Sequence, residues 1–142
     1  MAMTSSPFSD SRYLASARIL IVFEDRSAKG LMRLLRPGFR HCFCLVEHDE
    51  DWILVDPLKS SVRVEILRHI QLQLLIDHYR STGRTLLLGE ASAAPTSSTP
   101  LVRPMSCVEL VKRLVRIRAA AVWTPYQLYA RLLGGAAFTE PT

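Results

Sequence analysis

The pattern of apolar and polar positions divides the chain into a strand-rich first part and a helical last part. Residues 18–23, RILIVF, form a β-branched apolar run that is typical of a buried strand. The stretch 40–58, RHCFCLVEHDEDWILVDPL, predicts two strands joined by a tight acidic turn. Residues 62–66 alternate like a half-exposed strand, and 84–89 predict a short last strand.

Helical spacing appears between and after these strands. Residues 24–38 predict a turn or short helix, and 68–83 predict a longer helix that Gly83 ends. Two further helices are expected at about 106–119 and 124–133. Strands first, a mid-chain helix and two final helices predict an α+β domain with a mainly antiparallel sheet packed by helices.

Composition divides the chain further. A polar N-terminal segment (1–17) precedes one domain over 18–133, which contains a flexible Ala/Ser/Thr/Pro-rich loop at 90–105, and a C-terminal tail follows at 134–142. No apolar run reaches the roughly 18 residues of a membrane span, and no signal peptide is visible. With three cysteines, these features predict a cytoplasmic chain with reduced thiols, and association with a virion or release by lysis is compatible.

The net charge is +5, from 18 basic and 13 acidic residues, and most of the basic residues are arginines. Such a balance is compatible with a polyanion-binding surface. The basic residues are scattered among acidic ones, however, and no basic run of five occurs. We therefore expect no nucleic acid as the main partner, and a polyanion-binding domain stays an alternative.

Cys107 is the candidate nucleophile. Ser106 and Glu109 form the S-x-x-E pattern of a capping box, which places Cys107 at the first helical position. The positive end of the helix dipole favours a thiolate, and the free N–H of Cys107 could help to bind an oxyanion. The alternative is a cysteine that only packs in the core.

The strand pair supplies a candidate base. If Val46 lies opposite Asp51, His41 lies opposite Asp56 on the same face of the sheet. A carboxylate beside an imidazole fixes its tautomer and supports the imidazolium that catalysis forms. The alternatives are a strand-end histidine partly in solvent and an aspartate that caps the turn before Pro57.

A metal site is not expected. Cys42, Cys44 and His48 spell C-x-C-x3-H, but this set has only three ligands and an unusual spacing for zinc. The two cysteines alternate with His41, so we expect them to pack on the opposite face of the sheet. We expect His48 to be solvated in the turn, and no metal or organic cofactor.

Taken in order, four segments resemble a known family. They are ILIVFEDRSAKGLMRLLRPGFRHCFCLV (19–46), WILVDPL (52–58), SCVELVKRLV (106–115) and WTPYQLYARLL (123–133). This order is similar to that of the circularly permuted papain-like cysteine hydrolases of the YaeF/YiiX type, relatives of the NlpC cell-wall peptidases. In that family the histidine strand precedes the nucleophile helix, as it does here.

The resemblance implies roles for individual residues. Cys107 would be the nucleophile, His41 the general base and Asp56 the orienting group of a hydrolase that forms an acyl-thioester. An amide in a peptide or peptidoglycan stem peptide is the favoured substrate, and an ester, a thioester or acyl transfer is also permitted. Trp123 and Tyr126 could wall the substrate cleft, although we expect both to pack in the core. The alternative function is a non-catalytic papain-like module for binding or assembly.

Overall fold

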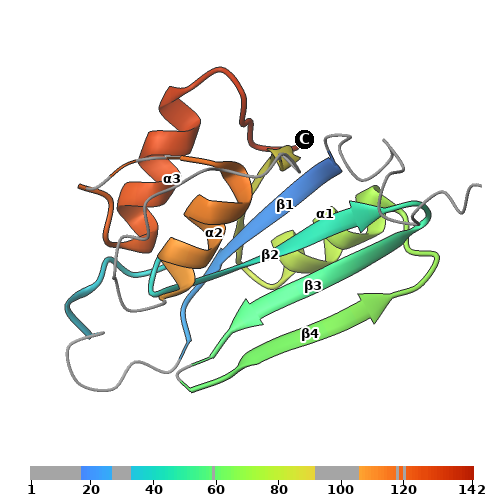
Figure 1. The fold of residues 1–142 in the computed structure, drawn as a ribbon, viewed down its shortest axis with the longest axis horizontal. Helices are drawn as coiled ribbons and strands as arrows, with labels where there is room; N and C mark the ends of the chain where they lie inside the picture. Colours follow the sequence, from blue (N-terminus) through green and yellow to red (C-terminus); the bar gives the residue numbers. More distant parts are fainter. Residues whose placement is uncertain (1–16, 27–32, 59, 92–105, 118, 120) are drawn as a thin grey trace, which may run out of the picture.

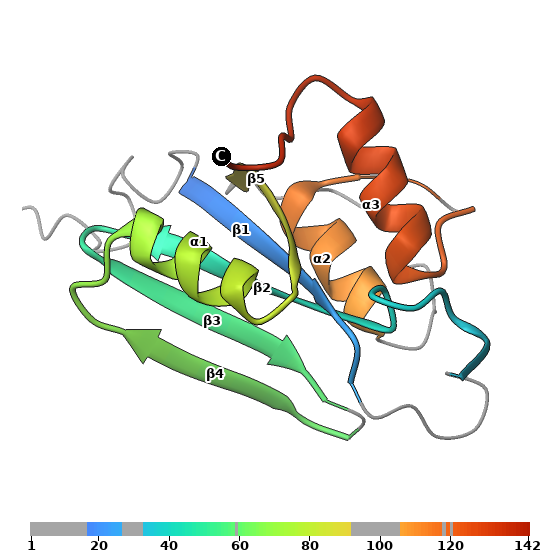
Figure 2. The ribbon, with the colours of Figure 1, turned by 180° about the vertical axis from the view of Figure 1, so that it is seen from behind.

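The computed structural model describes residues 17–26, 33–58, 60–91, 106–117, 119 and 121–142. One antiparallel sheet has five strands in the order β4-β3-β2-β1-β5. Helix α1 covers one face of the sheet, and α2 and α3 cover the other (Figures 1 and 2). The elements are β1 (Ala17–Glu24), β2 (His41–His48), β3 (Asp51–Pro57), β4 (Val62–Leu67), α1 (Leu72–Ser81), β5 (Thr85–Ala91), α2 (Cys107–Val115) and α3 (Pro125–Gly134). The predicted α+β class is confirmed.

The central strand β1 is apolar without alternation because both of its faces are covered. Its residues 19–23 have no exposed surface. Ile19, Ile21 and Phe23 pack under α2 and α3, whereas Leu20 and Val22 pack under α1. The sheet therefore separates two apolar cores, and a side chain's position along a strand decides which core it enters.

The register predicted for β2 and β3 is wrong by two residues. Leu45 lies opposite Leu54, and His48 lies opposite Asp51 across a two-residue turn. Asp49 adopts a positive φ of 54°, a conformation that aspartate tolerates and that a tight hairpin turn requires. Because side chains alternate with a period of two, the shift leaves every side chain on its predicted face.

The helix boundaries differ from the prediction in two places. Helix α2 ends at Val115 rather than near residue 119, because Arg116 takes the left-handed conformation with φ 59°. Helix α1 begins at Leu72 rather than at residue 68, since His69 also has a positive φ of 54°. The capping box of Thr124 and Gln127 that starts α3 is present in full.

The chain end lies against the sheet. Phe138 is buried, and Thr139 forms an isolated bridge with Leu88 of β5. Gly89 allows this approach, since a Cβ there would lie 2.4 Å from the Phe138 ring. Most of the predicted 90–105 loop lies outside the described residues, as do 27–32 of the predicted first turn. Among the described helices, none has the length and apolar character to cross a membrane.

Candidate active site

Cys107 occupies the first position of α2, as predicted. The Ser106 side chain accepts a hydrogen bond from the Glu109 backbone N–H at 3.2 Å, so Ser106 is the N-cap. The Glu109 carboxylate accepts a hydrogen bond from Lys112 Nζ at 2.7 Å. The buried Val108 anchors the first turn in the core under α2, while Cys107 itself is partly exposed. The N-cap and the buried neighbour fix the position of Cys107 at the start of α2.

His41 and Asp56 meet at one end of the sheet, where β2 begins and β3 ends. His41 Nε2 lies 2.7 Å from Asp56 Oδ1, and both residues are buried, with 5% and 3% of their surface exposed. Continuing the observed register places Asp56 opposite Phe43, so the His41–Asp56 contact is diagonal rather than directly across the strands. Asp56 therefore forms its hydrogen bond with Nε2 of His41, and Nδ1 of the ring stays available for another partner.

Cys107 interacts with both His41 and Cys42. Hydrogen bonds to Cys42, whose thiol and backbone N–H both contact Cys107, lower the pKa of the Cys107 thiol. Burial opposes this shift, but a hydrogen bond to His41 and the positive charge of its ring lower the pKa further, to about 4. The pKa of a free cysteine is about 8.5, so Cys107 is a thiolate in the neutral pH range.

The pKa of the His41 imidazole is shifted in the opposite direction, upward. Burial acts to lower the pKa of His41, but hydrogen bonds to Cys107 and Asp56 outweigh it and leave the pKa raised. The Cys107 thiolate and the His41 imidazolium consequently stabilise each other as an ion pair. The ion pair is present at pH values between the lowered pKa of the Cys107 thiol and the raised pKa of the His41 ring.

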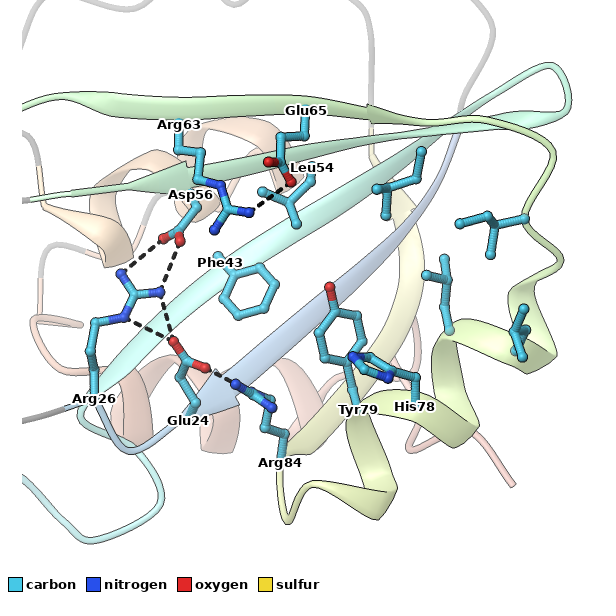
Figure 3. Close-up of a pocket in the computed structure, with 14 residues that line it drawn as sticks. Glu24, Arg26, Phe43, Leu54, Asp56, Arg63, Glu65, His78, Tyr79 and Arg84 are labelled. Atoms are coloured by element: carbon cyan, nitrogen blue, oxygen red, sulfur yellow. Dashed lines mark hydrogen bonds and ion pairs between the residues drawn. The ribbon is translucent and has the colours of Figure 1, made fainter.

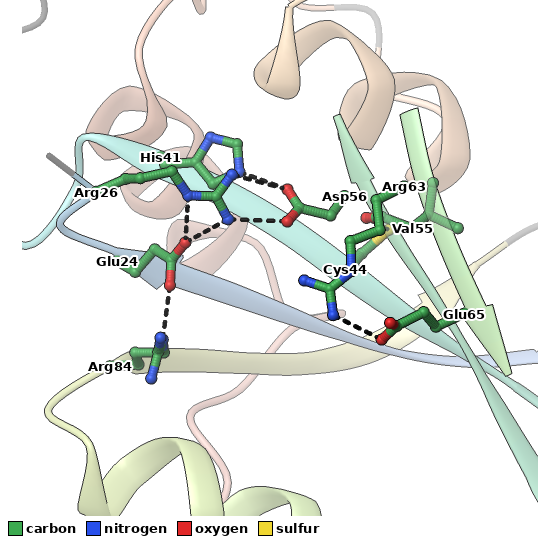
Figure 4. A network of polar contacts seen from close by, with 9 residues as sticks. All are labelled: Glu24, Arg26, His41, Cys44, Val55, Asp56, Arg63, Glu65 and Arg84. Atoms are coloured by element: carbon green, nitrogen blue, oxygen red, sulfur yellow. Dashed lines mark hydrogen bonds and ion pairs between the residues drawn. The ribbon is translucent and has the colours of Figure 1, made fainter. Parts of the chain in front are cut away.

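Asp56 is held ionised by a partly buried network of charges (Figure 4). Burial alone would raise the pKa of Asp56, but hydrogen bonds from Arg26 and His41 lower it. Arg26 Nη2 lies 2.8 Å from Asp56 Oδ2 and 2.7 Å from Glu24 Oε1. The second oxygen of Glu24 accepts a hydrogen bond from Arg84 Nε at 2.7 Å. The carboxylate beside His41 is thus itself positioned by a chain of ion pairs.

The sequence pattern does not single out Arg26 or Glu24. Glu24 ends β1 and lies directly opposite His41 in the β1–β2 ladder. Pairing the strand at 18–23 with the histidine strand would have placed Glu24 beside His41. Arg26 lies in the segment after β1, 30 residues from Asp56, and no local spacing indicates that contact.

Cys42 and Cys44 point to the face opposite Asp56, as predicted, which is the face that α2 and α3 cover. Cys42 and Cys44 have no exposed surface and belong to the core under α2 and α3. Burial raises the pKa of Cys44 to about 12, and contact with Cys107 together with burial raises the pKa of Cys42 well above its usual value. His48 is largely exposed, also as predicted. No group of three metal-ligating side chains occurs within the part of the chain that the structure describes.

The two residues suggested as cleft walls have different surroundings. Trp123 is 60% exposed, so the core position predicted for it is wrong. It precedes the N-cap of α3, and its backbone N–H donates to Gln127 Oε1 at 2.8 Å. Tyr126 packs edge-on against Phe39, with 5.1 Å between ring centroids, under the Arg36 guanidinium. An exposed Trp123 is compatible with a cleft wall.

A pocket of about 520 Å³ lies on the α1 face of the sheet (Figure 3). Its apolar walls include Phe43, Leu54 and Tyr79, and Asp56 lies at its charged rim with Arg26. Cys107 is not among its lining residues. The pocket therefore reaches the carboxylate side of the His41–Asp56 pair and not the sulfur.

The geometry defines an α+β protein in which a cysteine at a helix start, a histidine and an aspartate form one connected cluster. The chain matches no protein-family model, and comparison with curated proteins and with solved structures gives no significant match.

Proposed function

We propose that this protein is a thiol hydrolase with a permuted papain-like arrangement. Cys107 acts as the nucleophile, His41 as the general acid and base, and Asp56 as the group that orients His41. One observation carries the proposal: Cys42 and His41 lower the pKa of Cys107 to about 4, and Asp56 Oδ1 lies 2.7 Å from Nε2 of the same His41. A cysteine that only fills the core has a raised pKa, as Cys44 does.

Acylation begins from the ion pair. The Cys107 thiolate attacks the substrate carbonyl carbon and forms a C–S bond, while the carbonyl π electrons move onto the oxygen. The backbone N–H of Cys107, at the end of the helix where N–H groups lack intrahelical partners, donates to this oxyanion. The His41 imidazolium gives its Nδ1 proton to the leaving group as the bond to it breaks, which leaves an acyl-thioester on Cys107.

Deacylation reverses the roles. Neutral His41 accepts a proton from a water molecule, and the resulting hydroxide attacks the thioester carbonyl. The C–S bond breaks, the carboxylic acid leaves, and the thiolate–imidazolium pair forms again. Asp56 holds the ring through Nε2 in both half-reactions, which leaves Nδ1 for the proton transfer.

The favoured substrate is an amide in a peptide or a peptidoglycan stem peptide, on the strength of the family resemblance. Esters and thioesters pass through the same acyl-thioester. The alternative, a papain-like binding or assembly module, would use the fold without this chemistry. The two differ in whether Cys107 is a nucleophile in solution.

Alkylation by iodoacetamide at about pH 6, followed at each cysteine by peptide mass spectrometry, tests the nucleophile. We expect Cys107 to react at least 100-fold faster than Cys42 and Cys44, because only the thiolate reacts. His41→Ala should abolish most of this difference, whereas His78→Ala, an exposed histidine on α1, should not. Equally slow labelling of all three cysteines would favour the binding module.

Turnover is tested with an activated ester such as p-nitrophenyl acetate. We expect a burst of p-nitrophenol and a mass increase of one acetyl group on Cys107, followed by slower release of acetate. Cys107→Ser should remove the burst, and Cys44→Ser should retain it. A long-lived acyl group without release would point to acyl transfer to another acceptor instead of hydrolysis.

A further inference from the structure

Strand β4 forms one edge of the sheet and carries an apolar row on its outer positions. Val62, Val64 and Ile66 are 51%, 59% and 57% exposed. They share the sheet face of α2, but among the described strands α2 packs mainly on β2, β3 and β5. Between the three apolar side chains, Arg63 and Glu65 point to the opposite face and form an ion pair at 2.8 Å.

The unpaired backbone groups of this edge belong to the same three apolar residues. Leu58 N–H donates to Ser61 O at 2.8 Å, so these two residues face each other across the β3–β4 hairpin. In the continuous register that follows, hydrogen-bonded pairs alternate with non-bonded pairs. Arg63 and Glu65 therefore bond to β3, and Val62, Val64 and Ile66 direct their N–H and C=O groups outward. Pro57 agrees with this assignment, since it lies opposite Val62 and has no N–H to donate.

The sequence of this edge, VRVEI, is complementary to itself when it runs antiparallel. If a second copy pairs about a two-fold axis at Val64, Val62 lies opposite Ile66 and each Arg63 lies opposite Glu65 of the other copy. The apolar residues then form the hydrogen-bonded pairs. The charged residues form the non-bonded pairs, whose side chains lie closest. An axis at Arg63 or at Glu65 would instead place like charges directly opposite each other.

We propose that β4 pairs with β4 of a second copy of this chain, which joins the two sheets into one continuous ten-stranded sheet. The ladder contains about six hydrogen bonds and two Arg63–Glu65 ion pairs. Natural edge strands usually carry inward-pointing charges, prolines or covers that block such pairing. Here the only charges on the strand are the pair that favours one register. The proposal does not depend on the hydrolase function.

Charge exchange tests the pairing. Sedimentation velocity over a concentration series should show a monomer–dimer equilibrium for the wild-type protein. Arg63→Glu and Glu65→Arg each place like charges opposite each other, and we expect each to weaken the dimer at least tenfold. The double exchange restores opposite charges across the axis and should return the dissociation constant to within about threefold of wild type. A wild-type monomer at all concentrations, or a double variant no tighter than the single ones, would overturn the proposal.

A backbone test separates strand pairing from a general charge effect. Val64→Pro removes an outward N–H without removing a bond to β3, and we expect it to abolish the dimer while thermal unfolding stays cooperative. Val64→Thr keeps the N–H and the β-branched shape, and it should still dimerise. Hydrogen exchange of the Val64 amide should slow as protein concentration rises. Fast exchange of Val64 in a proven dimer would show that the copies meet elsewhere, and would contradict the proposal.

Discussion

Two cysteines of this protein lie within one apolar core and have opposite chemistry. Cys44 lies in the middle of β2, fully buried, with its Sγ directed at the Val55 carbonyl at 3.9 Å and a pKa raised to about 12. Cys107 begins α2, is partly exposed, and has a pKa lowered to about 4. Both packing environments are apolar, so burial alone does not explain the difference.

The difference comes from hydrogen-bond donors and charge. Cys44 faces a carbonyl oxygen, which stabilises the thiol and not the thiolate. Cys107 accepts hydrogen bonds from Cys42 and forms an ion pair with His41. It also lies at the positive end of the α2 helix dipole. The lowered pKa of Cys107 therefore depends on Cys42, His41 and the start of the helix, and each of these contributions can be removed by a separate substitution.

The largest expected effect comes from Asp56. Asp56→Ala removes the group that holds His41 Nε2, and we expect the rate of ester hydrolysis to fall about 100-fold. Asp56→Asn should recover part of this loss, because an amide oxygen also accepts a hydrogen bond from Nε2–H. Steady-state rates and thermal unfolding should be measured on both variants, and equal rates for Asp56→Ala and wild type would remove Asp56 from the mechanism.

Cys42 and Cys44 offer a matched pair for a smaller effect. Cys42→Ala removes a thiol that donates to Cys107, and we expect Cys107 alkylation at about pH 5 to slow roughly tenfold, which corresponds to a rise of about two pKa units from the starting value of about 4. Cys44→Ala creates a similar cavity on the same strand and should leave that rate unchanged. Alkylation rates of Cys107 measured by mass spectrometry compare the two variants directly. Equal slowing in both would assign the effect to packing.

Much of this arrangement follows from the sequence alone. Strand alternation places His41 and Asp56 on one face and Cys42 and Cys44 on the other, and the Ser106 cap fixes the start of α2. These features are predictable because they depend on residues close together in the chain.

Other features depend on backbone conformation or on distant contacts. The two-residue error in the β2–β3 register arises because Asp49 adopts a left-handed conformation without a glycine to mark it. Helix α2 ends before the predicted position for the same reason, because Arg116 also adopts a left-handed conformation. The Arg26 bridge between Glu24 and Asp56 joins segments far apart in the chain, so no local pattern indicates it.

The smallest expected effect distinguishes the loss of a helix cap in general from the loss of the one cap that holds Cys107. Ser106→Ala and Thr124→Ala each remove a side-chain N-cap, and each should lower the free energy of unfolding by about 1 kcal/mol. Only Ser106→Ala should also slow Cys107 alkylation, by about two- to threefold, because it loosens the turn that holds the sulfur. Chemical denaturation and labelling rates measure the two quantities independently, and slower labelling in Thr124→Ala would mean that general stability controls the thiol.

The pH dependence of Cys107 alkylation tests the central claim most directly. The thiolate forms as pH rises through the pKa of the folded protein, so the rate should rise with a midpoint near pH 4 and change again only where His41 loses its proton, above its ordinary pKa. His41→Ala should move the first midpoint upward. A single rise near the ordinary pKa of a cysteine, unchanged in His41→Ala, would contradict the account.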